Sequence, residues 1–493
     1  MNPLALLPLA IAAGNGRLGA AGDVAFDARQ LVAAGLTLLQ RSAPLVRALS
    51  GRRVAILLPT SPQFLVALAA AEGRGAVLVN PLAAPAEIAY QLADANVGAV
   101  LTNRALASRV PAGVPLVLLD DAPRSARVVT PDRTHDVDLG SHHGLTLEGE
   151  EDADGRDEEA VIVYTSAMRG TPLGAVLTHR NLLANARATI DAIGTRADDH
   201  LLALLPFSHL FGLTVTLSAP LMVGARVSAM ERFHPVKAAE LLAGDVSVVV
   251  GVPAVFHGLL AGLARRGGSI RGGALRLCVC GGAVLTTELQ ERWFDATGVE
   301  LRQGYGLTEA APVCVYNRSD RPNVRGTLGT AFPGVEVAIL RPVTGAGAPA
   351  DAHAASGASI PCPDGVPGEI AVRGENVFPG YLHDGSAGLP VIDGWLYTGD
   401  EGVRDADGNV TFLGLLKPMF TRNGFNIYPR ELERVIGAMP GVVRAEVTAT
   451  PDPVKENDIL LRVKGSVTEP EVRAWCESRL SAYKQPTVVE IAE

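Results

Sequence analysis

Predicted strands and helices alternate along this chain, and this alternation restricts the fold more than any other feature of the sequence. "RRVAILLP" (52–59) is an apolar run ended by proline, which predicts a buried strand. The segments that follow are predicted as a helix at 61–75, a strand at 76–80, a helix at 86–97 and a strand at 98–103. Such alternation is typical of a parallel sheet covered by helices on both faces.

The same alternation returns later, with helices predicted at 181–194, 254–265 and 286–297 and strands at 246–251 and 275–280. The last strand contains Cys278 and Cys280, and alternation along a strand places both thiols on one face. We interpret them as small core side chains rather than a metal pair, because no second pair of ligands lies nearby. Five cysteines, a small and odd number, indicate reduced thiols in a cytoplasmic protein.

The remaining segments differ in character. The polar, acidic segment 133–158 and the Pro-, Gly- and Ala-rich segment 341–368 are predicted as loops. Short segments separated by turns predict antiparallel strands over 368–413. After Gly414, a small α+β unit is predicted, with helices at 429–442 and 468–481, the second capped by Thr468, and strands at 443–452 and 458–465.

Composition excludes several classes of protein. The chain has 493 residues, 48% hydrophobic and 19% charged, which indicates a globular protein of two or more domains. A net charge of −9 argues against a nucleic-acid-binding surface. The apolar start, "MNPLALLPLAIAAGNG", lacks basic residues and contains two prolines, so we predict a core helix rather than a signal peptide. No segment is long and uniformly apolar enough to be predicted as a membrane span.

The segment "TSAMRGTPLG" (165–174) has the ends of a phosphate-binding loop but not its middle. Thr165 and Ser166 offer hydroxyl donors, and Gly170 and Gly174 would let a ligand approach the backbone closely. A phosphate-binding loop would need glycine, hydroxyl or lysine side chains at the positions occupied by Ala167, Met168 and Leu173.

Eight segments, in order and with plausible spacing, resemble the adenylate-forming enzymes, the family of acyl-CoA ligases, peptide-synthetase adenylation domains and luciferases. The segments are "VYTSAMRGTPLGAVLTHRNL", "LPFSHLFG", "CGGAVL", "QGYGLTEAAPV", "GTLGTAFPGVEV", "PGEIAVRG", "GWLYTGD" and "NGFNIYPRELE". Such enzymes first join a carboxylate to the α-phosphate of ATP, releasing pyrophosphate. Their small C-terminal domain then swings, and a thiol, often that of CoA, attacks the acyl-adenylate.

The resemblance implies an α/β fold with two unequal domains. The large N-terminal domain, residues 1–413, would combine layered parallel sheets (αβαβα) with a β-barrel-like subdomain. Residues 414–418 would form a hinge, and residues 419–493 a small mobile α+β domain.

The resemblance also implies a binding site for the nucleotide. Tyr305 would stack on adenine, Asp400 would accept the ribose hydroxyls, and Glu309 would contact Mg²⁺ if that ion is bound. Other residues implied to contact the acyl-adenylate are Thr165, Ser166, Gly281, Gly282, Ala283 and Thr308.

A second group of residues is implied to bind the acyl chain and CoA. Phe207, His209, Phe211 and Gly304 would line the acyl pocket, whose apolar character indicates a sizeable hydrophobic acid. His209, Gly424 and Phe425 would line the tunnel for the pantetheine arm of CoA. His209, Thr308 and Glu309 are the implied catalytic residues.

Several positions depart from the family pattern. In the signature loop, Ala167, Met168 and Arg169 replace Gly-Thr-Thr, and Leu173 replaces a lysine, although the Arg169 guanidinium is itself a good phosphate ligand. In the hinge, "GLLKP" keeps Gly414 and Lys417, but Leu415 replaces an arginine and Pro418 replaces the acidic pivot. Proline fixes its own φ and restricts the preceding residue, which suits a pivot poorly. The chain also stops about where the family's Gly-Lys segment would begin, and Lys484 does not match that lysine.

Most of these departures affect the triphosphate side of the reaction. We therefore expect an enzyme that takes a preformed acyl-adenylate of a hydrophobic acid, supplied by a partner ligase, and transfers the acyl group to CoA. Use of ATP would be weak or lost, since removing one preorganised donor typically lowers rates by about 10²–10³. The alternatives are a complete ATP-dependent acyl-CoA ligase in which Arg169 compensates, and a pseudoenzyme that binds acyl-adenylate or acyl-CoA. A carrier-protein thiol in place of CoA also stays open.

Overall fold

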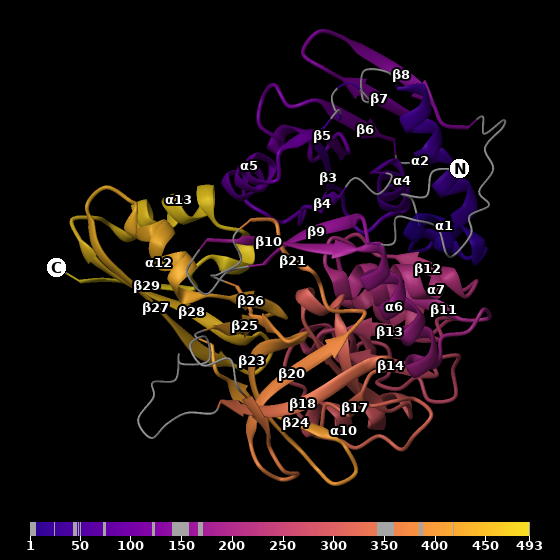
Figure 1. Ribbon diagram of the computed structural model, residues 1–493, viewed down its shortest axis with the longest axis vertical. Coiled ribbons are helices and arrows are strands. Elements are labelled where there is room, and N and C mark those ends of the chain that lie inside the picture. Colours follow the sequence, from indigo (N-terminus) through magenta and orange to yellow (C-terminus); the bar gives the residue numbers. More distant parts are fainter. Residues whose placement is uncertain are drawn as a thin grey trace.

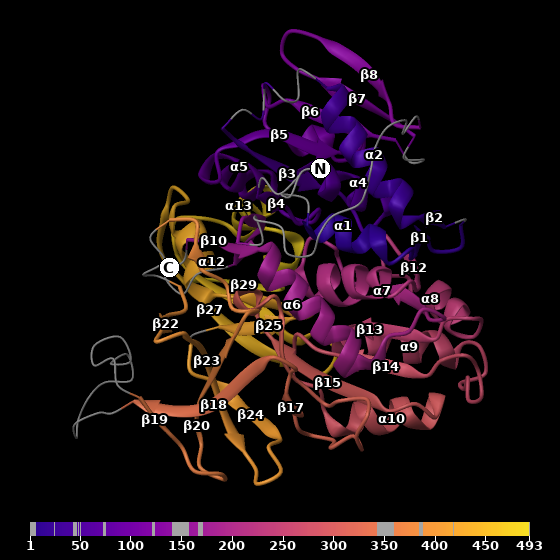
Figure 2. The same cartoon turned by 45° about the vertical axis from the view of Figure 1, so that its right-hand side comes forward.

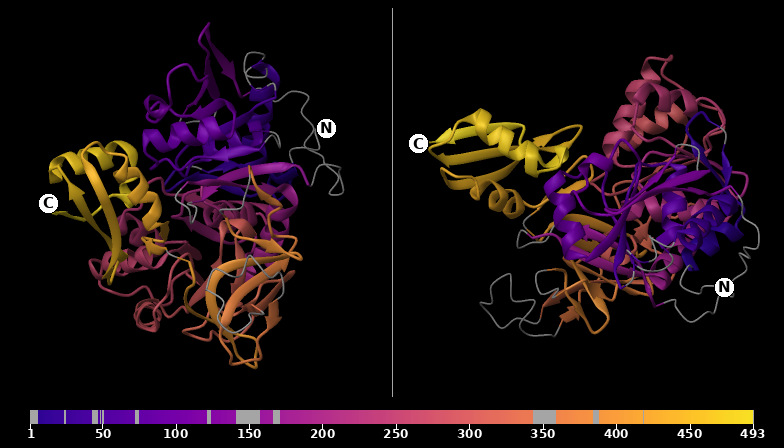
Figure 3. Two further views of the ribbon diagram at one scale, coloured as in Figure 1. Left: turned by 60° about the vertical axis from the view of Figure 1, so that its left-hand side comes forward. Right: turned by 90° about the horizontal axis from the view of Figure 1, so that it is seen from above.

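The computed structural model describes residues 6–23, 25–42, 47, 49, 51–71, 75–120, 124–140, 157–165, 171–342, 359–383, 388–417 and 419–492. Figure 1 shows a large N-terminal domain and, in yellow, a small C-terminal domain packed against one side of it. The two views of Figure 3 show the same separation, with the yellow domain at one side of the molecule.

One large sheet is formed mainly by strands between residues 53 and 178, with β21 (Gly380–Tyr381) added at one edge. Within the described residues its strand order is β21 (Gly380–Tyr381), β10 (Leu173–Thr178), β9 (Glu159–Thr165), β4 (Ala76–Leu78), β3 (Arg53–Leu57), β5 (Val97–Thr102), β6 (Leu116–Leu119), β7 (Ser125–Val129) and β8 (Thr134–Asp138). The strands from β9 to β6 are parallel, as the alternating sequence predicts. Both edges are antiparallel, which the sequence pattern did not predict.

A second large sheet has the same plan (Figure 2). Its order, within the described residues, is β17 (Thr330–Ala331), β16 (Val313–Tyr316), β15 (Leu301–Gly306), β14 (Leu277–Cys280), β13 (Val248–Gly251), β11 (His200–Ala203), β12 (Arg226–Ala229), β1 (Arg17–Ala20) and β2 (Phe26–Asp27). Strands β15 to β1 are parallel. Cys278 and Cys280 of β14 are fully buried on one face, in the same core cluster, which confirms their interpretation as core side chains.

Helices cover both sheets. They are α1 (Leu6–Ala13), α2 (Ala28–Arg41), α4 (Pro62–Ala71), α5 (Pro85–Asp94), α6 (His179–Thr189), α7 (Ala219–Met222), α8 (Pro235–Leu242), α9 (Pro253–Ala264) and α10 (Thr287–Thr297). Every residue of α4 is buried, since it packs against strands of both sheets and against α2. At Gly35 of α2 a Cβ would lie 2.3 Å from the Val66 carbonyl oxygen of α4, so only glycine permits this close packing.

The third part of the large domain is an antiparallel sheet. Its strands are β18 (Val335–Pro342), β19 (Ser359–Pro361), β20 (Gly368–Gly374), β22 (Val391–Ile392), β23 (Trp395–Arg404) and β24 (Val410–Leu415). The prediction of antiparallel strands over 368–413 is confirmed. Two loop predictions are wrong in part, because β8 lies within 133–158, and the end of β18 and all of β19 lie within 341–368.

The small C-terminal domain has the predicted α+β content. It comprises the hairpin β25 (Phe420–Arg422) and β26 (Phe425–Ile427), the helices α12 (Pro429–Gly437) and α13 (Glu469–Arg479), and a sheet of β27 (Val442–Asp452), β28 (Glu456–Gly465) and β29 (Val488–Ala492). Thr468 caps α13, as predicted. The predicted hinge at 414–418 begins inside β24, and Pro418 lies outside the described residues.

Candidate active site

A cavity of about 790 Å³ lies where the two domains meet. Its lining brings together strand ends of both large sheets, helix α5, the β23–β24 hairpin, and the hairpin and helices of the small domain. Most of the predicted site residues contribute to it: Thr165, His209, Phe211, Gly281, Gly282, Ala283, Gly304, Tyr305, Thr308, Glu309, Asp400, Gly424 and Phe425. The carboxyl ends of parallel strands are the usual place for a binding site in such sheets.

Asp400 lies at the centre of a buried polar group. Its Oδ2 accepts a hydrogen bond of 2.6 Å from the Tyr305 hydroxyl, and Lys417 Nζ lies 3.2 Å from its Oδ1. Lys417 also donates to the Thr398 carbonyl at 2.8 Å. Burial acts to lower the pKa of Lys417, but the Asp400 carboxylate and neighbouring groups outweigh it and raise that pKa overall. Asp400 thus has a fixed orientation next to the predicted adenine-stacking residue.

Leu415, one of the departures from the family pattern, lies directly opposite Asp400 in the register of β23 and β24. Residues opposite each other in an antiparallel pair project from the same face of the sheet. Leu415 is 38% exposed and lines the cavity. An arginine at this position would therefore lie beside the predicted ribose site, where leucine supplies no charge.

Glu309 lies in a short 3-10 helix (Thr308–Ala310) that follows β15, and is 5% exposed. Its Oε1 accepts a hydrogen bond of 2.8 Å from the Tyr381 hydroxyl and a longer one of 3.4 Å from Thr165 Oγ1. One carboxylate among hydroxyl groups fits a magnesium ion held mainly by substrate phosphates. Among the described residues, no group of three or more His, Cys, Asp or Glu side chains could hold a metal ion by itself.

His209 lines the cavity and receives a hydrogen bond of 3.2 Å from the Phe211 backbone N–H at its Nδ1. Nδ1 is therefore the acceptor, and the neutral ring carries its proton on Nε2. Burial lowers the pKa of His209 to about 4. The side chain is thus neutral near pH 7 and offers an N–H donor.

This burial predicts a pH-dependent loss of stability. The folded-state pKa of His209 is depressed to about 4, whereas the unfolded value is 6.5. The contribution of the neutral His209 ring to the free energy of unfolding is fully present above pH 6.5. It is lost as the pH falls toward 4, because in that range only the unfolded chain binds the proton. Allowing for solvent in the cavity, we expect a loss of about 2 kcal/mol. Urea unfolding of wild type and His209→Gln at pH 7.5 and 5 measures it; an equal pH dependence in both proteins would contradict this assignment.

Glycines shape the apolar part of the cavity. A Cβ on Gly281 would lie 3.2 Å from the Phe211 ring, and one on Gly304 would lie 3.4 Å from the Tyr316 ring. Buried apolar residues complete this part of the lining: Phe211, Val279, Val313, Tyr316 and Leu328. The prediction that Phe207 lines the acyl pocket is wrong, since Phe207 is 1% exposed in the core, packed edge-on against Phe64 at 5.6 Å, and is not part of the cavity wall.

The loop between β25 and β26 brings the small domain to the cavity. Gly424, at φ +76°, approaches the large domain so closely that a Cβ would lie 2.5 Å from Val252 Cγ1. Its carbonyl oxygen lies near Gly282. Phe425 follows and stacks on Tyr483, with ring centroids 4.2 Å apart. Gly424, predicted for the pantetheine tunnel, thus lies beside Gly282, predicted for the nucleotide.

The signature loop is described only at its ends. Ser166, Ala167, Met168, Arg169 and Gly170 lie outside the described residues. Leu173 begins β10 and lies opposite Thr165 of β9 in the strand register. Both side chains therefore project from the same face of the sheet. The position where the family pattern has lysine is thus on the face that bears Thr165, the partner of Glu309.

Sequence reasoning missed several contacts around the cavity. It gave no role to Tyr381, whose hydroxyl donates to Glu309, or to Lys417 beyond its retention. It also gave no role to Lys484, which is buried beside Glu87 and Glu431. The signal for Lys484 was a lysine in an otherwise core-forming "AYKQP" turn, but its partners are remote in sequence.

The comparisons with known sequences show the family of this chain. The sequence pattern of the AMP-binding enzyme family matches residues 44–382, more than half of the chain. A feruloyl-CoA synthase from Amycolatopsis sp is 31% identical over 462 residues, covering 90% of this chain and 85% of the relative. A long-chain-fatty-acid–CoA ligase from Bacillus subtilis is 28% identical over 475 residues, covering 89% and 82%. This chain belongs to the AMP-binding enzyme family, and these curated relatives are acyl-CoA ligases.

Solved structures confirm the fold class, with its large N-terminal and small C-terminal domains. A malonyl-CoA ligase in a ternary product complex with methylmalonyl-CoA and AMP is 27% identical with a TM-score of 0.77, covering 98% of this chain and 96% of that one. ATP-bound MatB from Rhodopseudomonas palustris is 28% identical with a TM-score of 0.67, covering 100% and 95%. In the part of the chain that the structure describes, no helix is long and apolar enough to cross a membrane.

Proposed function

We propose that this enzyme forms an acyl-CoA thioester from CoA and the acyl-adenylate of a hydrophobic carboxylic acid, with its own ATP-dependent adenylation weak or lost. The observation that carries the proposal is the position of Gly424. The predicted pantetheine loop is closed against Val252 and Gly282, so the residues predicted for CoA and those predicted for the adenylate line one cavity.

The residues suit this half-reaction. The CoA thiol releases its proton to solvent and its sulfur attacks the acyl carbon. A carbon–sulfur bond forms, the bond from that carbon to the phosphate oxygen breaks, and AMP leaves as its anion. We assign adenine stacking to Tyr305, the ribose contact to Asp400, and a neutral N–H donor at the acyl pocket to His209. Glu309 and Thr308 would hold a magnesium ion on the phosphate. The apolar lining favours a hydrophobic acyl group.

The weak adenylation rests on two apolar side chains in the described residues. Leu173 lies on the face of Thr165, and Leu415 lies opposite Asp400. Charge builds up on the phosphates during adenylation, and cations are needed to stabilise it. Two cationic positions of the family pattern thus carry leucine. A separate adenylating ligase would supply the acyl-adenylate, and residues 414–418 would be the hinge between the domains.

A second candidate is a complete ATP-dependent acyl-CoA ligase. The feruloyl-CoA synthase and fatty-acid–CoA ligase relatives favour it, as do the retained Thr308, Glu309 and Lys417. Arg169 would then supply the charge missing at Leu173.

The two candidates differ in a direct assay. With synthetic cinnamoyl-AMP or dodecanoyl-AMP and CoA, we expect acyl-CoA formation. With the free acids, ATP, Mg²⁺ and CoA, we expect rates lower by about 10² or more, since cationic donors are missing. Acyl-CoA formation is measured by liquid chromatography, and ATP-dependent adenylation is measured by pyrophosphate exchange. Absence of thioester from both acyl-AMPs would refute the proposal, and vigorous pyrophosphate exchange would establish the second candidate.

A further inference from the structure

A lysine of the small domain is buried against the large domain. Lys484 Nζ lies 2.9 Å from Glu87 Oε1, on helix α5 of the large domain, and 2.6 Å from Glu431 Oε1, on helix α12 of its own domain. The Ser481 hydroxyl also donates to Glu87. Figure 1 shows α13, which precedes this segment, beside α5.

The burial of this group makes it sensitive to disruption. The Lys484 side chain is 6% exposed, and those of Glu87 and Glu431 are 13% and 4% exposed. Breaking a buried ion pair on one side leaves an uncompensated charge, whereas an exposed surface pair contributes little. The contact between Lys484 and Glu87 forms only when the domains are oriented as they are here, so it favours this orientation.

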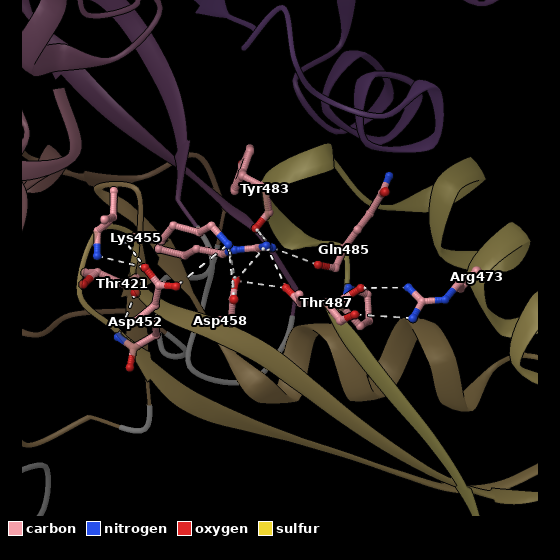
Figure 4. A network of polar contacts seen from close by, with 12 residues as sticks. Thr421, Asp452, Lys455, Asp458, Arg473, Tyr483, Gln485 and Thr487 are labelled. Carbon is pink, nitrogen blue, oxygen red and sulfur yellow. Dashed lines mark hydrogen bonds and ion pairs between the residues drawn. The ribbon is translucent and has the colours of Figure 1, made fainter. Parts of the chain in front are cut away.

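The segment that carries Lys484 is held firmly within the small domain (Figure 4). Arg422 of β25 donates to the carbonyl oxygens of Tyr483 and Gln485, at 3.1 and 2.8 Å, and to Thr487 Oγ1 at 2.9 Å. Arg422 also pairs with Asp458 of β28. The segment is thereby joined to the hairpin whose tip is Gly424.

Tyr483 extends this connection to the cavity. Its ring stacks on Phe425 at 4.2 Å with 18° between the planes. Lys484 therefore contacts the large domain while the adjacent residue contacts the predicted pantetheine loop. A displacement of Lys484 from the large domain would therefore also move Tyr483 and, through it, the predicted pantetheine loop.

We infer that the Lys484–Glu87 contact positions the small domain for thioester formation, by fixing the loop of Gly424 and Phe425 at the cavity. Lys484 and Glu87 act as positioning residues, since the acyl transfer itself is assigned to other groups. The inference rests on the proposed function, in which this orientation is the one that uses CoA.

Two variants test the cross-domain contact. Glu87→Gln and Lys484→Met are expected to lower kcat for acyl transfer from cinnamoyl-AMP to CoA by about 10-fold to 100-fold. The Kd for AMP, measured by calorimetry, is expected to change less than threefold or so, because Tyr305 and Asp400 stay in place. Glu87→Lys combined with Lys484→Glu, in a Glu431→Gln background that avoids two buried carboxylates side by side, restores the pair in reverse and is expected to recover part of the rate.

Two further variants are controls. Glu431→Gln removes only the partner within the small domain and is expected to lower kcat less than Glu87→Gln does. Arg462→Gln removes an exposed pair with Glu490 on the same domain and is expected to leave the rate unchanged. A larger effect of Glu431→Gln than of Glu87→Gln, or no effect of Glu87→Gln, would overturn the inference.

Domain orientation gives a readout that does not depend on turnover. The five native cysteines are buried, so cysteines introduced at the exposed Arg104 and Val443 can be spin-labelled selectively. With AMP bound, wild type is expected to show one narrow distance distribution, and Glu87→Gln and Lys484→Met a broadened one. A narrow distribution in both variants would overturn the inference even if wild type proved to be a complete ligase. If both variants show broadened distances but the wild-type protein forms no thioester from acyl-AMP, the proposed function alone would be refuted.

Discussion

Asp400→Asn is expected to destabilise the protein by about 3 kcal/mol, because Lys417 would keep a buried charge without its carboxylate partner. The Asp400 and Lys417 side chains are each 8% exposed and lie 3.2 Å apart. The same change removes the predicted ribose acceptor, so AMP binding is expected to weaken by about tenfold or more. Urea unfolding and calorimetry with AMP measure the two effects.

A double variant separates the two effects of Asp400. Asp400→Leu with Lys417→Met replaces the buried ion pair by apolar side chains, a change that is often neutral or stabilising. It is expected to recover most of the lost stability but none of the AMP binding. If AMP binding were unchanged in Asp400→Asn, the assignment of Asp400 to the ribose would be wrong.

Restoring two cations is expected to raise pyrophosphate exchange. Leu173→Lys combined with Leu415→Arg places positive charge on the face of Thr165 and opposite Asp400. We expect a gain on the order of 10² in pyrophosphate exchange with a hydrophobic acid and ATP, the size of the effect of one preorganised donor. Acyl transfer from acyl-AMP to CoA is expected to change much less.

The controls match the added charge and the added length. Leu416→Arg adds a cation at the next residue, which is 51% exposed and does not line the cavity. Leu173→Met changes shape without charge. Both are expected to leave pyrophosphate exchange at the wild-type level. If Leu416→Arg raised pyrophosphate exchange as much as the double variant, the gain would not depend on charge at positions 173 and 415, and the prediction would be wrong.

The regular elements were accessible from the sequence because their signals are local. The helix predicted at 286–297 is α10, with its N-cap at Thr286 and a left-handed glycine at Gly298. Strand β8 was missed because "THDVD" alternates weakly and is mostly polar, as an edge strand allows. The antiparallel edges of both large sheets were missed because pairing direction depends on neighbours that no local pattern reveals.

The site was accessible only in part, for a related reason. The resemblance placed Tyr305 and Asp400 at the nucleotide, and the structure brings them within a hydrogen bond of each other. The position of Leu415 opposite Asp400 depends on strand register, and that of Lys484 beside Glu87 depends on the packing of two domains. Phe207 was misplaced because the apolar "LPFSHLFG" segment does not show which of its faces meets the cavity.

The fully buried helix α4 has a consequence for the spacing of the site. The helix packs against β3 of one large sheet and β1 of the other, so the two sheets share a single core. Thr165 comes from the first sheet and Tyr305 from the second. The packing of this common layer therefore influences how far apart these two cavity-lining residues lie. A change of side-chain volume on α4, which does not line the cavity, is therefore expected to alter the spacing of Thr165 and Tyr305.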